Sequence, residues 1–386
     1  MDHAIARSSD LSVRIPVHAR SWVIRQTLCF DSAGYAFRQR DIEISGSRIS
    51  ALLPAGTSTL ADGVDGSSFV CTPGVVGIET AMPRPRGATS VVSRPGCVTC
   101  IALHCTSMRE LTESEQVGPM RTVALLEFSG NYLEQVNGFL EWFLSASRGR
   151  FGAQADPPLS VMPVLASARL LSASEVIEFA KFAKTMGTRI GVRLSSNADD
   201  ALEFRSRFYC SESALMAYLL AHESNLTMFN ASRIDRREAS LLTRMNCAVS
   251  LDELGSPHDL TDLWKAHSPL FLQARAALHV RTSYAQGLLS RVAGGTPSSR
   301  LDRYADALTR SAALAVGLSD VGVLAPGMKA DFCVFDRDRG DDYGAGSATL
   351  LSLLATREPA FTVVDGRALG GGATASAAVP AELAHA

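Results

Sequence analysis

The sequence has little lysine, little net charge and no long apolar run. Only four of its 37 basic residues are lysines, and the first of these is Lys181. The basic residues nearly balance 39 acidic ones, which gives a formal net charge of −2. No basic excess is therefore present to neutralise nucleic-acid phosphates. No apolar stretch reaches the roughly 18 residues that a membrane-spanning helix needs. These absences argue against nucleic-acid-binding proteins and integral membrane proteins.

Histidine is sparse, and no two histidines are arranged as H-x-H. The eight cysteines lie mostly in apolar, strand-like runs. In a chain of this length such a pattern predicts reduced, buried thiols and a cytoplasmic protein. Cys97 and Cys100 have C-x-x-C spacing, but the surrounding CVTCIAL is strand-like, whereas a zinc knuckle or redox motif needs a turn there. We interpret this pair as structural.

The length of 386 residues and the 46% of hydrophobic residues are typical of a globular protein with a large core. We expect a short flexible leader over 1–20 and a disordered, Gly/Ala-rich tail over 369–386. Residues 21–70 and 319–368 are both rich in β-like runs, and the family resemblance set out below implies that they form one small composite β domain. Within the first of these segments, Ser45-Gly46 predicts the turn of a hairpin.

Residues 71–318 alternate strand-like and helical segments. The clearest helix runs from Ser172 to Met186, where Ser172 and Glu175 form an S-x-x-E capping box and Gly187 supplies a stop. The alternation predicts a (β/α)₈ TIM-type barrel, with an open doubly wound sheet as the alternative. The eight strand candidates lie at 75–82, 97–105, 121–129, 159–165, 189–196, 225–232, 246–253 and 288–295.

The first strand of this predicted barrel carries a recognisable motif. Residues 72–87 resemble the first-strand segment of the cyclic amidohydrolases, and among them of the dihydroorotases, P-G-[LV]-[IV]-D-x-H-x-H-x-R-x-P-G. In that family the two histidines bind zinc and the arginine binds the substrate carboxylate. Here Glu79 and Ala81 stand at the two histidine positions, and Pro83 stands at the arginine, next to Arg84. The frame of the motif is present without its functional side chains.

The resemblance continues along the chain, and so does the loss. By this resemblance Arg193 stands at the position of the strand-five metal histidine, and Asn230 stands at that of the strand-six histidine. Gly295 stands at the position of the strand-eight catalytic aspartate. No lysine precedes Lys181, which excludes a carbamylated lysine on strand four. Hydrolytic zinc needs about three protein ligands, and the reaction needs a carboxylate for the proton. The resemblance thus implies that zinc is lost, that no other cofactor replaces it, and that no catalytic residue remains.

The side chains at these positions suggest other roles. Arg193 puts a permanent positive charge where the family holds a cation, and we expect Glu79 to pair with it across the barrel mouth. Arg84, Arg193 and Asn230 are candidate remnants of an anion-binding site. His104 ends the second strand candidate, and we interpret it as a structural histidine.

The end of the chain closes the resemblance. Residues 322–336, GVLAPGMKADFCVFD, are similar to the family segment G-x-L-x-P-G-x-x-A-D that returns the chain to its small β domain. The likeness covers roughly residues 21–368 and is greatest for the inactive dihydroorotase-like subunits of bacterial pyrimidine synthesis. Those subunits have also lost their metal ligands and act as partners of aspartate transcarbamoylase.

This resemblance implies a function. It implies a pseudoenzyme that serves as a structural or regulatory subunit of the aspartate transcarbamoylase catalytic chain, in an oligomeric assembly in the cytoplasm. Two alternatives remain open. One is an active hydrolase of C–N bonds with an atypical site, and the other is a regulatory pseudoenzyme that binds a small molecule.

Overall fold

The structure is a computed structural model of the chain. The residues it describes are 20–79, 97–106, 120–128, 138, 159–166, 172–185, 189–195, 197–220, 226–231, 234–251, 270–272, 298–338, 340 and 342–370. The leader expected over 1–20 lies outside these residues except for Arg20. The last described strand extends to Gly370, two residues into the segment expected as a tail.

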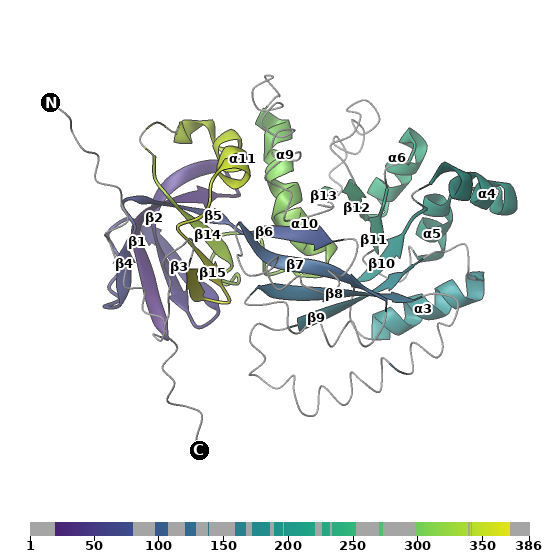
Figure 1. Ribbon diagram of the computed structural model, residues 1–386, viewed down its shortest axis with the longest axis horizontal. Helices are drawn as coiled ribbons and strands as arrows, with labels where there is room; N and C mark the ends of the chain where they lie inside the picture. Colours follow the sequence, from purple (N-terminus) through teal and green to yellow (C-terminus); the bar gives the residue numbers. More distant parts are fainter. Residues whose placement is uncertain are drawn as a thin grey trace, which may run out of the picture.

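The first of two sheets draws its strands from both ends of the described chain. Its order is β16-β15-β14-β5-β1-β2-β3, with β4 paired to β1, and β5 pairs antiparallel with β14. Figure 1 shows the purple and yellow strands side by side. The domain boundaries predicted at 21–70 and 319–368 stay predictions. The strands are β1 (Ser21–Asp31), β2 (Ala36–Ser45), β3 (Arg48–Pro54), β4 (Gly63–Asp65), β5 (Phe69–Pro73), β14 (Phe332–Asp336), β15 (Phe361–Val364) and β16 (Arg367–Gly370).

The predicted hairpin is confirmed within this sheet. Strands β2 and β3 pair antiparallel, and Ser45 lies opposite Arg48. Gly46 has a φ of 56°, a left-handed conformation that glycine adopts without a steric penalty. The apolar side chains of Trp22, Ile42 and Phe332 are buried together beneath the hairpin. A short loop and one buried face therefore fix the register of this pair.

The second sheet contains eight parallel strands paired in chain order, and it curls as it proceeds (Figure 1). Because this order never reverses, a doubly wound sheet does not describe it. Seven predicted strands are confirmed. Strand β13 was not predicted, and the candidate at 288–295 lies outside the described residues. The strands are β6 (Val75–Glu79), β7 (Val98–Cys105), β8 (Arg121–Phe128), β9 (Leu159–Leu165), β10 (Ile190–Arg193), β11 (Leu226–Phe229), β12 (Ala248–Leu251) and β13 (Leu270–Leu272).

Helices cover this sheet and join it to the first one. In α3 the predicted capping box is confirmed, because the Glu175 amide donates to Ser172 Oγ and the Ser172 amide donates to Glu175 Oε2. The described helices are α3 (Ala173–Thr185), α4 (Ala198–Phe208), α5 (Glu212–Leu220), α6 (Arg236–Arg244), α9 (Ser298–Leu308), α10 (Arg310–Ala315), α11 (Ser347–Thr356) and the single 3₁₀ turn η5 (Tyr343–Ala345).

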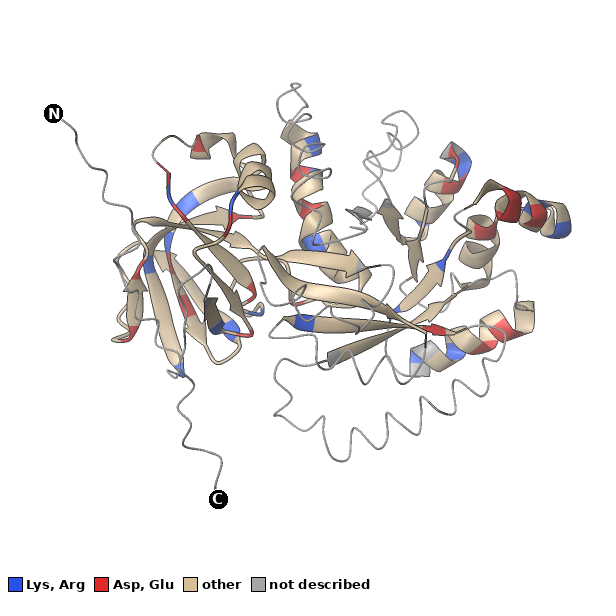
Figure 2. Cartoon of the chain, viewed as in Figure 1, with Lys and Arg blue, Asp and Glu red and all other residues tan. Residues whose placement is uncertain are grey.

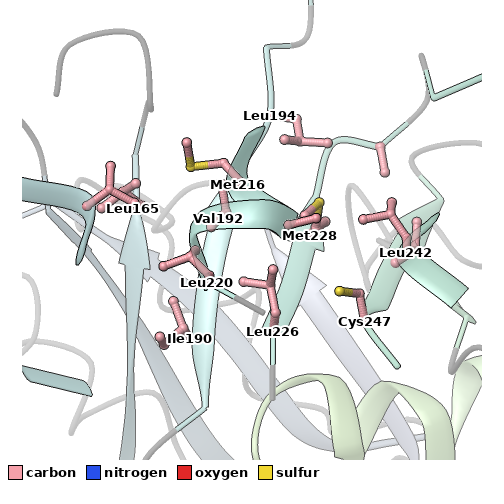
Figure 3. Packing of buried hydrophobic residues seen from close by; sticks show 14 of the residues in the cluster. Leu165, Ile190, Val192, Leu194, Met216, Leu220, Leu226, Met228, Leu242 and Cys247 are labelled. Atoms are coloured by element: carbon pink, nitrogen blue, oxygen red, sulfur yellow. The ribbon is translucent and has the colours of Figure 1, made fainter. Parts of the chain in front are cut away.

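Alternating side chains of the parallel strands enter two different clusters. Those facing α3 to α6, such as Val192 and Met228, form an outer cluster with Met216 and Leu242 (Figure 3). Those facing the other way form what we call the inner cluster, which α10 covers. Its members are Val76, Ile78, Cys100, Ala102, Val123, Leu125, Met162, Val164, Phe229, Ala248, Ala312, Ala313, Ala315, Val316 and Val321.

A buried ion cluster ties the two sheets together. Arg121 opens β8, and its Nε lies 2.6 Å from Asp331 Oδ2 while its Nη2 lies 2.9 Å from Asp365 Oδ1. The Asp365 amide donates to Asp331 Oδ1 at 2.7 Å, and Lys329 Nζ lies 3.2 Å from Asp365. Burial alone would lower the pKa of Arg121, but the two carboxylates outweigh burial and raise it. The aspartate of the A-D segment is thus a structural joint between the sheets.

The thiols are unpaired, and the helices are short. All eight cysteines are free thiols. Cys100 is buried in β7, and burial raises its pKa to about 12, which is the opposite of a reactive redox thiol. No helix in the described ranges is long and apolar enough to cross a membrane.

Candidate functional site

Charged residues are rare on the strands of the second sheet (Figure 2). Near the carboxyl ends of β7 and β8, two described ionisable side chains face inward. On β7, Cys100 and Ala102 belong to the inner cluster, so His104, two residues further on, has the same orientation. On β8 the same alternation from Leu125 places Glu127 inside. Active sites of barrel proteins lie at this carboxyl end of the strands.

A third charged side chain comes from β10. Gly191 faces inward, because a Cβ atom added there would meet the side chains of Val164 and Phe229. Arg193 lies two residues further along, at the last position of the strand. It therefore has the orientation of His104 and Glu127, and these three side chains form the candidate site.

The side chains of His104 and Arg193 both contact the same carboxylate oxygen of Glu127. His104 Nδ1 lies 2.9 Å from Glu127 Oε1, and Arg193 Nη2 contacts the same atom. His104 and Glu127 are buried, whereas 25% of the Arg193 side chain is exposed. The ring of Phe229 meets the His104 ring edge-on, with centroids 5.4 Å apart. The site is a small ion cluster at the wall of an apolar interior.

Electrostatics make His104 a neutral imidazole at pH 7. Burial lowers its pKa, the Glu127 contact opposes this effect, and the nearby Arg193 charge lowers the pKa further. Contact between Nδ1 and a carboxylate favours the Nδ1–H tautomer, which makes Nε2 an acceptor. Nε2 is buried and has no hydrogen-bond partner among the described residues.

The donor set at this site does not fit a divalent metal ion. Hydrolytic zinc needs about three protein donors and an open position for water. His104 and Glu127 supply two, and the Arg193 guanidinium already contacts the Glu127 oxygen that would face a metal. A second cation at that oxygen would be repelled. Within the described ranges, no group of three His, Cys, Asp or Glu side chains could hold a metal ion.

The structure tests only some of the predicted positions. The Glu79 backbone ends β6, but its side chain lies outside the described residues, as do Ala81, Arg84 and Gly295 entirely. The predicted pairing of Glu79 with Arg193 therefore stays a prediction. Among the described side chains, Glu127 of a different strand contacts Arg193.

Asn230 does not join Arg193 in the inner site. The residue of β11 that enters the inner cluster is Phe229. Asn230 follows it with a φ of 57°, donates from Nδ2 to the Leu194 carbonyl at 3.5 Å, and lines a separate cavity. Asn230 lies directly after the end of β11, and its predicted role in anion binding stays a prediction.

Glu127 and Phe229 are the two site residues that the sequence interpretation missed. Glu127 had a signal: it continues the alternation of Val123 and Leu125 in an apolar strand, at the strand's carboxyl end. A carboxylate in such a position needs a buried partner. Phe229 had no signal, because its neighbours Met228 and Leu226 are equally apolar.

The curled parallel sheet and its covering helices have the same fold as solved structures of a triazine hydrolase and of two deaminases. The triazine hydrolase from Arthrobacter aurescens covers 91% of this chain and 95% of its own length, with a TM-score of 0.70 and 13% identity. The adenosine deaminase from Xanthomonas campestris with bound zinc covers 90% of this chain and 92% of its own length, with a TM-score of 0.71 and 13% identity. The Helicobacter pylori aminofutalosine deaminase covers 90% of this chain and 100% of its own length, with a TM-score of 0.68 and 13% identity. No family model and no curated protein matches the sequence. The likeness at this identity concerns the fold.

Proposed function

We propose that this protein is a pseudoenzyme with an amidohydrolase fold, in which an internal ion cluster stands where a metal centre would be. The observation that carries the proposal is the contact of Arg193 with Glu127 beside His104. A guanidinium group does not lose its proton in proteins, so this positive charge is permanent. It supplies the charge balance of a metal ion and offers no position for a nucleophilic water.

The surroundings of the cluster support the same proposal. Phe229 presents an aromatic ring where another donor would be needed to bind a metal ion. The His104 ring meets that ring edge-on, and the acceptor atom Nε2 of His104 is buried. General-base catalysis needs the base within hydrogen-bond reach of the proton it removes. In this arrangement the buried Nε2 atom of His104 is not within reach of a substrate proton.

We further propose that the protein acts as a structural or regulatory subunit of the aspartate transcarbamoylase catalytic chain, in an oligomeric cytoplasmic assembly. This part of the proposal is supported by the sequence resemblance over 72–87 and 322–336. A role in assembly also gives a reason why a fold persists without the chemistry of its site.

Metal analysis tests the first part. The purified protein is incubated with zinc, desalted and analysed by inductively coupled plasma mass spectrometry, and dihydroorotate hydrolysis is assayed in parallel. We expect well below one zinc ion per chain and no hydrolysis. The variant Arg193→His/Phe229→His replaces the guanidinium and the ring with two donors beside His104 and Glu127, and it serves as a positive control for zinc retention. One zinc ion per wild-type chain together with hydrolysis would overturn the proposal.

Native mass tests the second part. The chain is run alone and mixed with aspartate transcarbamoylase from the same source, by size exclusion with light scattering. We expect a joint peak of defined stoichiometry. Two separate peaks at micromolar concentration would refute the partnership and leave the metal experiment unaffected.

A further inference from the structure

Two thiols from distant parts of the chain, Cys97 and Cys333, meet where the two sheets adjoin. Cys97 directly precedes β7 of the second sheet, and Cys333 lies in β14 of the first sheet, 236 positions later. The Cys333 thiol donates to the Cys97 carbonyl oxygen at 3.3 Å, and the two side chains are also hydrogen-bonded to each other. The two sulfur atoms are therefore already neighbours in the reduced protein.

The surroundings hold this pair of thiols in place. Cys333 is buried in an apolar cluster to which both sheets contribute, among them Val70 of β5 and Leu103 of β7. Cys97 packs against the same cluster, and its Sγ lies 3.7 Å from the Arg357 carbonyl oxygen, directly after α11. Close packing leaves little room for either side chain to turn away from the other.

The thiol that is close to Cys97 in the sequence, Cys100, faces a different part of the molecule. The register of β6 on β7 shifts directly after Val75, which is paired with Val98. With this shift, Cys97 and Val98 pack in the cluster between the sheets, whereas Cys100 enters the inner cluster. The C-x-x-C spacing therefore does not identify the partner of Cys97, and the fold does.

The two thiols differ in their access to solvent. Cys97 is partly exposed, whereas Cys333 is fully buried. The hydrogen bond with the Cys97 side chain and then burial raise the pKa of Cys333 well above its usual value. Susceptibility to oxidants follows exposure and thiolate character. An oxidant from solvent therefore meets Cys97 first, and Cys333 stays a neutral thiol beside it.

We propose that Cys97 and Cys333 are a reversible oxidation site for hydrogen peroxide, and that the resulting disulfide stabilises the joint between the two sheets. The Cys97 sulfur attacks the peroxide, the O–O bond breaks, and Cys97 becomes a sulfenic acid as one water leaves. The Cys333 sulfur then attacks the Cys97 sulfur, the S–O bond breaks, and the Cys333 proton leaves with the hydroxide as a second water. The two thiols lose two electrons, which the peroxide gains. Exchange with a dithiol reduces the disulfide again.

The disulfide acts beside the ion cluster of Arg121. Asp331 of that cluster directly precedes β14, the strand that carries Cys333. The disulfide closes a loop between positions 236 apart, which restricts the unfolded chain and favours the folded one. The inference goes beyond the proposed function, and it requires neither the loss of catalysis nor the aspartate transcarbamoylase partner.

Peptide mapping tests the site. The full chain is treated with hydrogen peroxide at low protein concentration, unfolded in N-ethylmaleimide and digested with trypsin without reduction. Mass spectrometry is expected to find the tryptic peptide 330–337, which contains Cys333, linked to the peptide that contains Cys97 in most chains, and dithiothreitol should release it. Cys97 oxidised to a sulfinic acid beside an unreacted Cys333, no oxidation of Cys97, or a link between two copies on a non-reducing gel would overturn the proposal.

Variants then identify the linked thiol, because Cys97 and Cys100 share one tryptic peptide, 87–109. Cys97→Ser is expected to abolish the link to peptide 330–337, whereas Cys100→Ala, three positions further on, is expected to leave it intact. Circular dichroism checks folding, and if Cys97→Ser does not fold, Cys333→Ala carries the test by the loss of any disulfide at Cys97. A link that survives Cys97→Ser, or that is lost in folded Cys100→Ala, would refute the site.

Thermal unfolding tests the stabilisation of the joint. The oxidised wild type is expected to have a Tm about 3–6 °C above that of the reduced protein, and dithiothreitol should remove the difference. Cys97→Ser treated with peroxide in the same way should show no rise. A linked chain with an unchanged or lowered Tm would overturn the stabilising role. Neither zinc content nor co-elution with a partner enters these results.

Discussion

Strand β8 carries two ion clusters, one at each end, and they differ in completeness. At its start, Arg121 lies between Asp331 and Asp365, and every side chain of this joint meets an oppositely charged one. Near its end, Glu127 lies between Arg193 and His104, and the buried His104 Nε2 has no hydrogen-bond partner in the described part of the chain. The first cluster joins the two sheets, whereas the second leaves a buried nitrogen atom without a partner among the described residues.

The difference follows from what each cluster must do. A fully satisfied buried network fixes the arrangement of the elements it joins, whereas a partly satisfied one costs stability. The first cluster holds the two sheets in register through Asp331. The second retains an inward imidazole and an inward carboxylate that packing alone does not require. The comparison predicts different responses to substitution at the two ends.

The largest effect is expected at the complete cluster. Arg121→Met leaves Asp331 and Asp365 buried with their main cationic partner removed, which destabilises a protein by about 3–5 kcal/mol. Guanidinium chloride denaturation measures the loss. Arg38→Met, which removes the exposed pair with Asp31 at 3.3 Å, is the matched control and should cost less than about 1 kcal/mol. Similar losses in both variants would remove the distinction between a buried joint and a surface pair.

A smaller effect is expected at the incomplete cluster. Arg193→Met takes one partner from Glu127 while His104 keeps its contact, so the expected loss is about 1–3 kcal/mol. The same change removes a positive charge that lowers the pKa of His104, and the pKa of that group should rise. NMR titration of the imidazole signals checks this shift, with Arg205→Met as a control of equal charge change. A His104 titration unaltered by Arg193→Met would show that burial alone sets the pKa.

The smallest effect is a pH dependence of stability. The pKa of His104 is lowered in the folded state, so the unfolded chain binds the proton more readily at mildly acidic pH. The contribution to stability is complete above the ordinary pKa of about 6.5 and falls as the pH is lowered toward the folded-state value, by at most about 1.4 kcal/mol per pH unit.

Denaturation at pH 7.5, 6.5 and 5.5 measures this slope. His104→Gln removes the titrating group, so its stability should vary less over the same range, with other groups contributing equally to both proteins. Parallel curves for the wild type and the variant would contradict the assignment.

Local features were predictable from the sequence. The capping box of Ser172 and Glu175 and the turn at Gly46 depend on residues within a few positions of each other, and both are confirmed. The seven confirmed strands follow from apolar runs of ordinary strand length bounded by turn residues. These signals need no knowledge of the rest of the molecule.

The site was less predictable, because it depends on which strands meet and on which side chains face inward. Glu127 and Arg193 are brought together by the pairing and curl of three strands, β8 to β10, and the periodicity of the sequence does not predict this meeting. The choice between Phe229 and Asn230 depends on a one-residue register that moves a side chain to the opposite face. The resemblance gave Arg193 as a position of the metal site, and Glu127, which contacts Arg193, is not part of that resemblance.

The first sheet is built from strands near both ends of the described chain, and this has a consequence during synthesis on the ribosome. Trp22 Nε1 donates to the Gly366 carbonyl across 344 positions of sequence, and β5 pairs with β14. At a synthesis rate of roughly 5–20 residues per second, the strands made first wait on the order of 20–70 s on the ribosome for those that complete their sheet. During that interval β5 exposes an unpaired edge, the kind of surface that templates aggregation. The nascent chain therefore has a defined period in which chaperone binding matters most, and it ends when β14 leaves the exit tunnel.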